Sequence, residues 1–123
     1  MPQTSTILGN EQKICISSLN EINIVPIPHI VRCESKSNYT TIHLIDGVKL
    51  VASKPLCDFE ELLDKHNFCR VHNSHLVNMA FVKSFKRNNG YSITLYDDTC
   101  IAVATRRKDD FLMRVKAMSF ASF

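Results

Sequence analysis

The alternation of apolar and polar residues at every second position is the feature that most constrains the fold of this chain. Runs of this kind, or apolar runs of strand length, recur at residues 14–16, 22–25, 30–34, 39–44, 48–52, 68–71, 81–85, 91–95 and 100–104. Successive side chains of a strand point to opposite faces, so each run can bury one face and leave the other in solvent. A chain of 123 residues suffices for one domain. The pattern therefore predicts a single, mainly β domain.

Residues typical of tight turns separate these runs. Asp46-Gly47 is a strong signal for a two-residue hairpin turn between residues 39–44 and 48–52. Lys36-Ser37-Asn38 and Asp97-Asp98 are polar turn sequences, and Leu19-Asn20-Glu21 joins the first two runs. The runs therefore indicate short strands connected by turns, with a hairpin at residues 39–52.

Helical spacing occurs in one internal segment, at about residues 54–65. Ser53 is its expected N-cap, and Pro55 suits its first turn. The apolar residues of the predicted buried face are Leu56, Phe59, Leu62 and Leu63, and the acidic residues of the opposite face are Asp58, Glu60 and Glu61. We expect that acidic face to be a solvated surface. A C-terminal helix is predicted over residues 107–118, with Phe111, Leu112, Val115 and Met118 on one face.

The ends of the chain and its cysteines bear on its setting. We expect residues 1–12 to be a flexible leader or linker remnant, residues 13–118 to form the domain, and residues 119–123 to be a tail. No apolar run approaches the roughly 20 residues that span a bilayer, and the N-terminus lacks the features of a signal peptide. The five cysteines are an odd number with no C-x-x-C pair, and four of them lie beside apolar residues in strand-like runs. We therefore expect reduced thiols that fill the core. A cytoplasmic protein with no membrane partner is the resulting expectation.

Positive charge is concentrated in the second half of the chain. Residues 1–66 carry six Lys and Arg against eight Asp and Glu, a net charge of −2, whereas residues 67–123 carry nine against four, a net charge of +5. A basic half suits a polyanionic partner, although a merely solvated surface has the same composition.

The densest polar signal is the segment from Phe68 to Asn78. A strand over residues 68–71 would place Arg70 and His72 together on its solvent-facing side, next to Asn73 and Ser74. Arginine and serine suit phosphate oxygens, and asparagine can pair with the N6/N7 edge of adenine. The alternative is that Asn73 and Ser74 only stabilise a turn through bonds to the backbone.

Two further polar clusters carry comparable chemistry. Residues 105–108, Thr-Arg-Arg-Lys, lie at the start of the predicted last helix. Cations are unfavourable there because the N-terminal end of a helix carries partial positive charge, and a bound phosphate would offset this repulsion. One of the arginines could also reach O6 and N7 of a guanine. Residues 36–39 combine a cation, an amide and an aromatic ring in a turn. A solvated charge run and an ordinary polar turn are the alternatives for these two clusters.

The three clusters together resemble the signatures of LytTR-type DNA-binding domains. Residues 30–42 resemble the family's opening signature, and residues 68–78 match its F-x-R-x-H-x-S-x-L-V-N pattern nearly position for position. Residues 101–108 are similar to its third signature, with Thr105 where serine is common. The order and spacing of the three blocks agree over roughly residues 13 to 116, and the middle block is the most specific.

The resemblance implies an elongated β-β-β arrangement of short antiparallel sheets whose loops, rather than a recognition helix, enter successive major grooves of duplex DNA. It implies base reading by Asn38, Tyr39, Asn73 and Arg106, and phosphate or sugar contacts by Lys36, Arg70, His72, Ser74, Arg107 and Lys108.

The resemblance also implies a biological setting. It implies a bacterial transcriptional regulator that binds short direct repeats, on which two copies can pair. Family members are commonly output domains of two-component response regulators, which implies a receiver domain or a cognate sensor kinase upstream.

Three alternatives come from other classes of protein. Cys69, His72 and His75 are metal-ligand types at plausible spacing, but strand geometry directs Cys69 and His72 to opposite faces and no fourth ligand is evident, so we expect no metal or cofactor. An enzyme is disfavoured because no nucleophile elbow, glycine-rich phosphate loop or H-E-x-x-H motif occurs. Binding of single-stranded nucleic acid would need clustered exposed aromatics. Only the three tyrosines look available for it, and they are dispersed.

Overall fold

The computed structural model describes residues 12–18 and 20–118, which form ten strands and two α-helices. The expected tail, all of the expected leader but Gln12, and turn residue Leu19 lie outside the described residues. The strands are β1 (Lys13–Ser17), β2 (Ile22–Pro26), β3 (Ile30–Lys36), β4 (Tyr39–Leu44), β5 (Lys49–Ala52), β6 (Phe68–His72), β7 (His75–Asn78), β8 (Val82–Lys86), β9 (Tyr91–Leu95) and β10 (Cys100–Val103), and the helices are α2 (Leu56–Leu62) and α3 (Lys108–Lys116).

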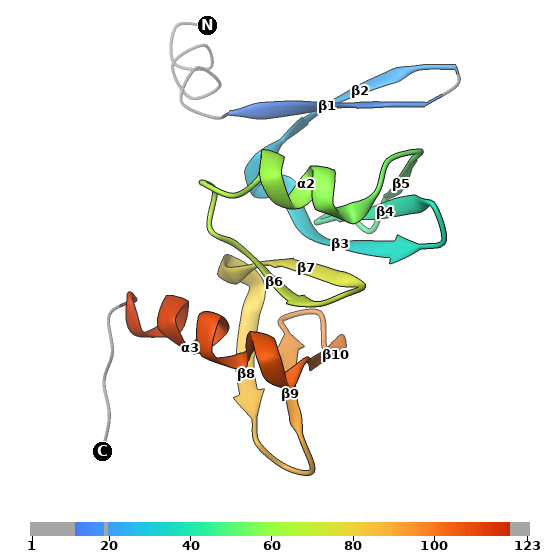
Figure 1. Ribbon diagram of the computed structural model, residues 1–123. Coiled ribbons are helices and arrows are strands. Elements are labelled where there is room, and N and C mark those ends of the chain that lie inside the picture. The colour runs from blue at the N-terminus through green and yellow to red at the C-terminus, as the bar shows by residue number, and fades with distance from the viewer. Residues whose placement is uncertain (1–11, 19, 119–123) are drawn as a thin grey trace, which may run out of the picture.

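The strands form three antiparallel sheets that follow one another along the long axis of the molecule (Figure 1). A hairpin of β1 and β2 lies at one end, a five-stranded sheet of order β5-β4-β3-β7-β6 lies in the middle, and a three-stranded sheet of order β10-β9-β8 lies at the other end. The prediction of an elongated, mainly β fold of short antiparallel sheets with one internal and one C-terminal helix is confirmed. Among the described residues, no helix is both long enough and apolar enough to cross a bilayer.

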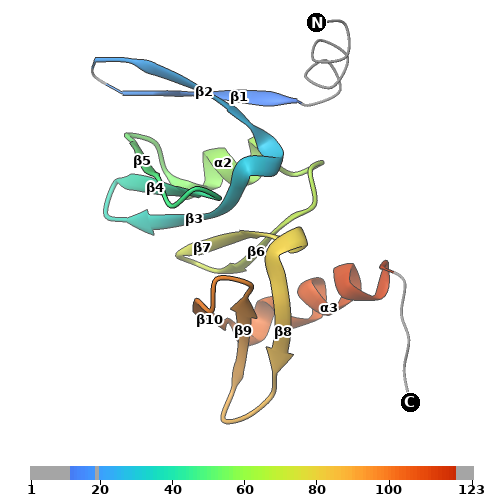
Figure 2. The ribbon, with the colours of Figure 1, turned by 180° about the vertical axis from the view of Figure 1, so that it is seen from behind.

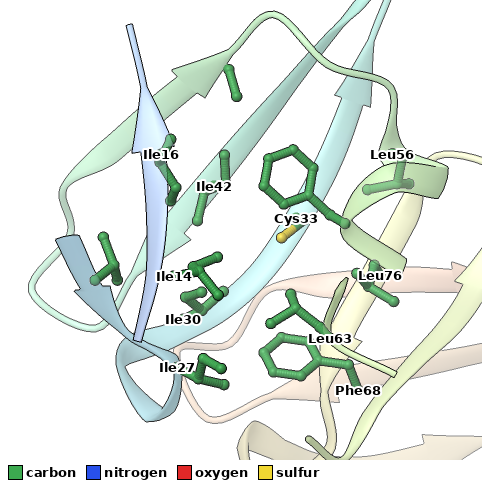
Figure 3. Close-up of a cluster of buried hydrophobic side chains, with 13 residues drawn as sticks. Ile14, Ile16, Ile27, Ile30, Cys33, Ile42, Leu56, Leu63, Phe68 and Leu76 are labelled. Atoms are coloured by element: carbon green, nitrogen blue, oxygen red, sulfur yellow. The ribbon is translucent and has the colours of Figure 1, made fainter. Parts of the chain in front are cut away.

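Two hydrophobic cores lie on opposite faces of the five-stranded sheet. In the first core, the β1–β2 hairpin and α2 cover one face, where Ile14 and Leu56 pack towards Cys33, Ile42 and other side chains of the sheet (Figure 3). In the second core, the other face of β6 and β7 packs against the three-stranded sheet and α3. Its fully buried members include Cys69, Val71, Val77, Ile93, Leu95 and Phe111.

Helix α3 closes the second core from one side. Seen from behind, it lies beyond β8 and β9 (Figure 2). The ring of Phe111 stacks on that of Phe85 of β8 with centroids 5.4 Å apart. The guanidinium Nη1 of Arg114 donates to the carbonyl oxygen of Phe68 at 2.8 Å, so α3 is held to β6 as well as to β8.

Strand β7 was not predicted from the sequence, although it lies between β3 and β6 in the centre of the middle sheet. Leu76 belongs to the first core and the next residue, Val77, to the second. A strand that is buried on both faces has no apolar–polar alternation, so period-two spacing cannot reveal it. The sequence predicts an irregular link over residues 73–75. In the structure His75 begins β7 and pairs with His72, so that only Asn73 and Ser74 form a turn.

Several local expectations were wrong in detail. Helix α2 is shorter than residues 54–65, and its N-cap is Pro55 without a side-chain cap, rather than Ser53. Leu62 is 52 % exposed instead of buried. The buried face consists of Leu56, Phe59 and Leu63, which share one side of the helix at spacings of three and four residues, and Leu62 lies off that side.

The connection between β4 and β5 comprises residues 45–48 and is longer than a two-residue turn. The backbone N–H of Leu44 donates to the carbonyl of Val48, and Gly47 adopts a left-handed φ of 87°. Glycine tolerates that conformation because it has no Cβ.

The cysteines are reduced but do not all fill the core. Cys33 and Cys69 are buried, whereas Cys15, Cys57 and Cys100 are exposed and none is in a disulfide. The alternation of side chains along a strand explains why Cys15 and Cys100 are exposed. Each points outward, and the residues next to it in the strand, such as Ile14 and Ile101, point into a core.

Replacement of Leu76 by alanine should lower the free energy of unfolding by about 2–5 kcal/mol, because it opens a cavity in the first core. The matched control is Leu62→Ala, which removes the same atoms from an exposed site and should change stability by less than about 0.5 kcal/mol. Chemical denaturation of the two variants measures both values. Equal losses would contradict the assignment of Leu76 to the core and Leu62 to the surface.

Candidate nucleic-acid interface

Three turns that carry the predicted base-reading residues meet along one edge of the molecule. The β3–β4 and β6–β7 turns are adjacent because β3 pairs with β7, and the N–H of Ser35 donates to the carbonyl of Ser74 at 2.9 Å. The start of α3 joins them, since the N–H of Ala104 donates to the carbonyl of Val71 at 2.8 Å. Both hairpin turns and the first turn of α3 point to the right in Figure 1. We call residues 36–39, 72–74 and 105–107 the loop edge.

The β3–β4 turn presents two of the predicted reading residues to solvent. Lys36 pairs with Tyr39, so that Ser37 and Asn38 form the turn, and Ser37 adopts a left-handed φ of 55°. Asn38 is exposed, and 51 % of Tyr39 is accessible. Side chains at the tip of a hairpin extend beyond the sheet, so both residues can reach a partner that approaches this edge.

Asn73 and Arg106 are in direct contact although they are 33 positions apart in the sequence. The Nη2 group of Arg106 donates to Oδ1 of Asn73 at 2.6 Å, and both residues are exposed. This bond orients the Asn73 amide, because Oδ1 must face the guanidinium and Nδ2 must point away from it. The structure therefore joins two of the predicted base-reading residues into one polar unit.

Arg70 does not face solvent as the sequence indicated. Only 13 % of its side chain is exposed, and its guanidinium lies within the protein. Nε donates to the carbonyl of His72 at 2.9 Å, Nη2 to the carbonyl of Asn73 at 2.6 Å, and Nη1 to a carboxylate oxygen of Glu60 at 2.6 Å. The acidic face of α2 is solvated at Asp58 and Glu61, as expected, whereas Glu60 is 40 % exposed and forms this ion pair.

Arg107 and Lys108 lie where the last strand turns into α3. Residues Thr105–Arg107 form a 3-10 turn that leads directly into the helix. Arg107 is half-buried, and its Nε is buried without a hydrogen-bond partner among the described residues. The Lys108 ammonium lies 5.0 Å from the centroid of the Tyr91 ring, a cation–π contact that holds it over the three-stranded sheet.

A polar cluster of histidines covers the sheet beside the loop edge. Glu34 lies 3.2 Å from His43 Nε2 and 3.5 Å from Arg32 Nη1, and it pairs across strands with His75. The rings of His72 and His75 are 5.5 Å apart. Nδ1 of His72 accepts a hydrogen bond from the N–H of Ser74 at 3.1 Å, which helps to close the β6–β7 turn.

Lys54 is a basic residue of this edge that the sequence interpretation did not include. Its carbonyl accepts a hydrogen bond from the hydroxyl of Thr40 at 2.7 Å, which places the segment after β5 beside the β3–β4 turn. The position of Lys54 could have been predicted from the expected hairpin of β4 and β5. Antiparallel pairing brings the end of β5 back to the beginning of β4, where the β3–β4 turn lies.

The combination of Cys69, His72 and His75 forms no metal site. Within residues 12–18 and 20–118, no group of three or more histidine, cysteine or acidic side chains is arranged to hold a metal ion. Cys69 is fully buried in the second core, and burial raises the pKa of its thiol to about 12. A thiol of that kind is neither a ready metal ligand nor a nucleophile.

Comparison with known proteins identifies a family and a shared fold. The family model of the LytTr DNA-binding domain matches residues 20–116. A solved structure of the LytTr DNA-binding domain assigned to a methyl-accepting/DNA response regulator of Bacillus cereus superimposes with a TM-score of 0.72 at 18 % identity. That match covers 86 % of this chain and 98 % of the other, and at this identity it shows a shared fold. A search of curated protein sequences gives no match.

Acidification should destabilise the fold through the histidine cluster. Burial lowers the pKa of both His43 and His75, with Arg32 acting in the same direction and Glu34 opposing it. His72 and His43 also lower the pKa of His75. At about pH 6 the unfolded chain therefore binds more protons than the folded chain. The stability that the neutral rings contribute above about pH 6.5 is lost as the pH falls below that value.

The melting temperature should therefore fall as the pH is lowered from about 7.5 to about 5.5, and it should fall less steeply in the His75→Gln variant. An unchanged slope in that variant would exclude His75 as a source of the effect.

Proposed function

Because the chain belongs to the LytTr DNA-binding domain family, we propose that it binds duplex DNA sequence-specifically as the DNA-binding part of a bacterial transcriptional regulator. The single observation that carries this proposal is the hydrogen bond between Asn73 and Arg106, which unites two side chains capable of base reading at the loop edge. The nearby β3–β4 turn adds Asn38 and Tyr39 to the same edge.

The geometry supports base reading by Asn73 and Arg106 as a unit. An asparagine amide pairs with adenine by accepting from N6–H and donating to N7, and an arginine donates to O6 and N7 of guanine. Oδ1 of Asn73 has a second lone pair beside the one that receives the Arg106 donor. Asn73 can therefore bind an adenine while Arg106, which has further N–H groups, binds a neighbouring guanine.

Contacts to phosphates would fix the register of the duplex without reading its sequence. Lys36 and Lys54 are exposed near the β3–β4 turn, and His72, Ser74, Arg107 and Lys108 flank the other two turns. Arg70 leaves this proposed set because each of its three guanidinium nitrogens already donates a hydrogen bond within the protein. Lys108 would have to leave the face of Tyr91 to reach a phosphate.

The arrangement of the turns fits reading of more than one groove. The β3–β4 turn and the start of α3 lie on either side of the β6–β7 turn along the loop edge, so we propose that they enter successive major grooves. Two copies on a pair of short direct repeats would extend the interface. The Bacillus cereus domain of the same fold is assigned to a response regulator, and we propose a receiver domain or sensor kinase as the upstream partner of this chain.

Duplex DNA fits better than single-stranded nucleic acid. Binding of single strands depends on aromatic side chains that stack on successive bases. Phe59, Phe68 and Phe111 are buried in the cores. Of the two exposed rings, Tyr39 begins β4 of the middle sheet, whereas Tyr96 follows β9 of the terminal sheet. Among the described residues, the exposed aromatic side chains are thus not clustered as a stacking surface requires.

Selection from a randomised duplex pool should yield a preferred site, and Asn73→Ala and Arg106→Ala should each weaken binding to it by about 1–3 kcal/mol. Each variant should also lose preference at one base position, because a base contact specifies sequence. Asn88→Ala, an exposed asparagine in the β8–β9 turn, is the matched control and should bind normally. Equal losses on selected and random DNA would exclude base reading by the two residues.

Binding should depend strongly on salt. If about five phosphates are neutralised, log K should fall against log salt concentration with a slope of about −4 to −5. Lys36→Ala should flatten that slope by about one unit and weaken all duplexes alike. Lys65→Ala removes the same charge from the segment after α2, on the left in Figure 1 and away from the loop edge, and should keep the native slope. Identical slopes in both variants would contradict contact between the β3–β4 turn and DNA.

A further inference from the structure

We propose that Glu60 and Arg70 are positioning residues, which hold the β6–β7 turn in the conformation that presents Asn73 to DNA. This inference rests on the proposed function and adds to it a contribution from α2, an element that does not belong to the loop edge. No base or phosphate contact is assigned to either residue. Their role is to act through Asn73.

The fork of the Arg70 guanidinium joins two elements of the structure. Two of its N–H groups hold consecutive carbonyls of the turn, those of His72 and Asn73, at 2.9 and 2.6 Å. The third binds Glu60 of α2 at 2.6 Å. An arginine can make these bonds at once because its donors diverge from one rigid plane, which a lysine ammonium cannot reproduce.

Glu60 is needed because the arginine is mostly withdrawn from water. With 13 % of its side chain exposed, an Arg70 without a carboxylate partner would leave a largely buried charge uncompensated. The guanidinium would then gain by turning towards solvent, and both carbonyls of the turn would lose their donor. Glu60 is 40 % exposed, so removing it does not open the hydrophobic core.

Helix α2 is a firm anchor for this contact. Leu56 and Phe59 of the helix, and Leu63 directly after it, are buried in the first core. A continuous set of contacts therefore leads from that core through Glu60 and Arg70 to the backbone of Asn73. The side chain of Asn73 is in turn held by Arg106, so the amide is fixed at both its backbone and its oxygen.

Such ordering raises affinity because the turn loses less conformational freedom on binding. The effect should be specific, since an asparagine amide must match the donor and acceptor of one base edge, whereas phosphate contacts tolerate small displacements.

Because Glu60 is negatively charged, a positioning role and a purely electrostatic effect predict opposite changes in DNA affinity when it is replaced. Glu60→Gln removes a negative charge from a protein that binds a polyanion, so charge alone predicts tighter binding to every duplex. If Arg70 contacted a phosphate directly, Glu60→Gln would also be expected to bind DNA more tightly, because the guanidinium would be freed from its ion pair with Glu60. The positioning role predicts the opposite direction, weaker binding to the preferred site.

The experiment compares Glu60→Gln and Arg70→Lys with Glu61→Gln in the complete chain. Glu61 is the adjacent, exposed acidic residue of α2, so its variant carries the same charge change. We expect Glu60→Gln and Arg70→Lys to bind the selected duplex roughly two- to tenfold more weakly, with a smaller change on random duplex. Glu61→Gln should bind both duplexes as tightly as the native chain or slightly more tightly. Arg70→Lys keeps the charge, so its loss would reflect the fork geometry.

Amide hydrogen exchange at Asn73 and Ser74 provides a second readout that needs no DNA. Exchange there should be faster in Glu60→Gln and Arg70→Lys than in Glu61→Gln, while the melting temperature shows that each variant is folded. Tighter or unchanged binding by Glu60→Gln, or unchanged exchange, would overturn the positioning role. Failure of the native chain itself to prefer any duplex would instead overturn the proposed function, and the exchange result would still decide the role of Glu60 and Arg70.

Discussion

The burial of β7 on both faces is the constraint on which the rest of the structure depends. Leu76 and Val77 are neighbours in sequence but lie in separate cores, one against the β1–β2 hairpin and α2, the other against the terminal sheet and α3. The strand also supplies hydrogen bonds to β3 and β6. Strand β7 thus joins the two halves of this elongated molecule from the centre of the middle sheet, and its neighbours β3 and β6 also supply residues to both cores. The turn between β6 and β7 lies at the edge of that sheet.

That placement explains how polar residues from distant parts of the chain share one edge. The β3–β4 turn reaches it through pairing with β7, and the start of α3 through the bond between Ala104 and Val71. Neither contact involves the side chains that would touch DNA. The scaffold determines where the turns lie, and their exposed side chains supply the chemistry, which is the usual division in binding sites carried by loops.

Net charge would contribute less to the recognition of DNA at the loop edge than the polar network does. The net charge is only +3, and several cations are already engaged: Arg70 by Glu60, Lys108 by Tyr91 and Arg114 by the carbonyl of Phe68. Long-range attraction to a polyanion through net charge is correspondingly modest. The salt dependence expected of binding comes from direct phosphate contacts. Discrimination between duplexes would then depend on the fixed orientation of a few amide and guanidinium groups, which a partly buried network can maintain and a solvated one cannot.

The sequence alone determined the β class, most strand positions and the three polar clusters, because period-two spacing and turn residues are local signals. It also supported the family resemblance through the residues of those clusters. Only the tertiary structure decided that β7 is a strand, that Leu62 is exposed, and that Arg70 turns inward to Glu60. A strand covered on both faces has no alternation to detect. An ion pair between a helix and a strand ten residues apart depends on how the two elements pack, and local spacing carries no information about that packing.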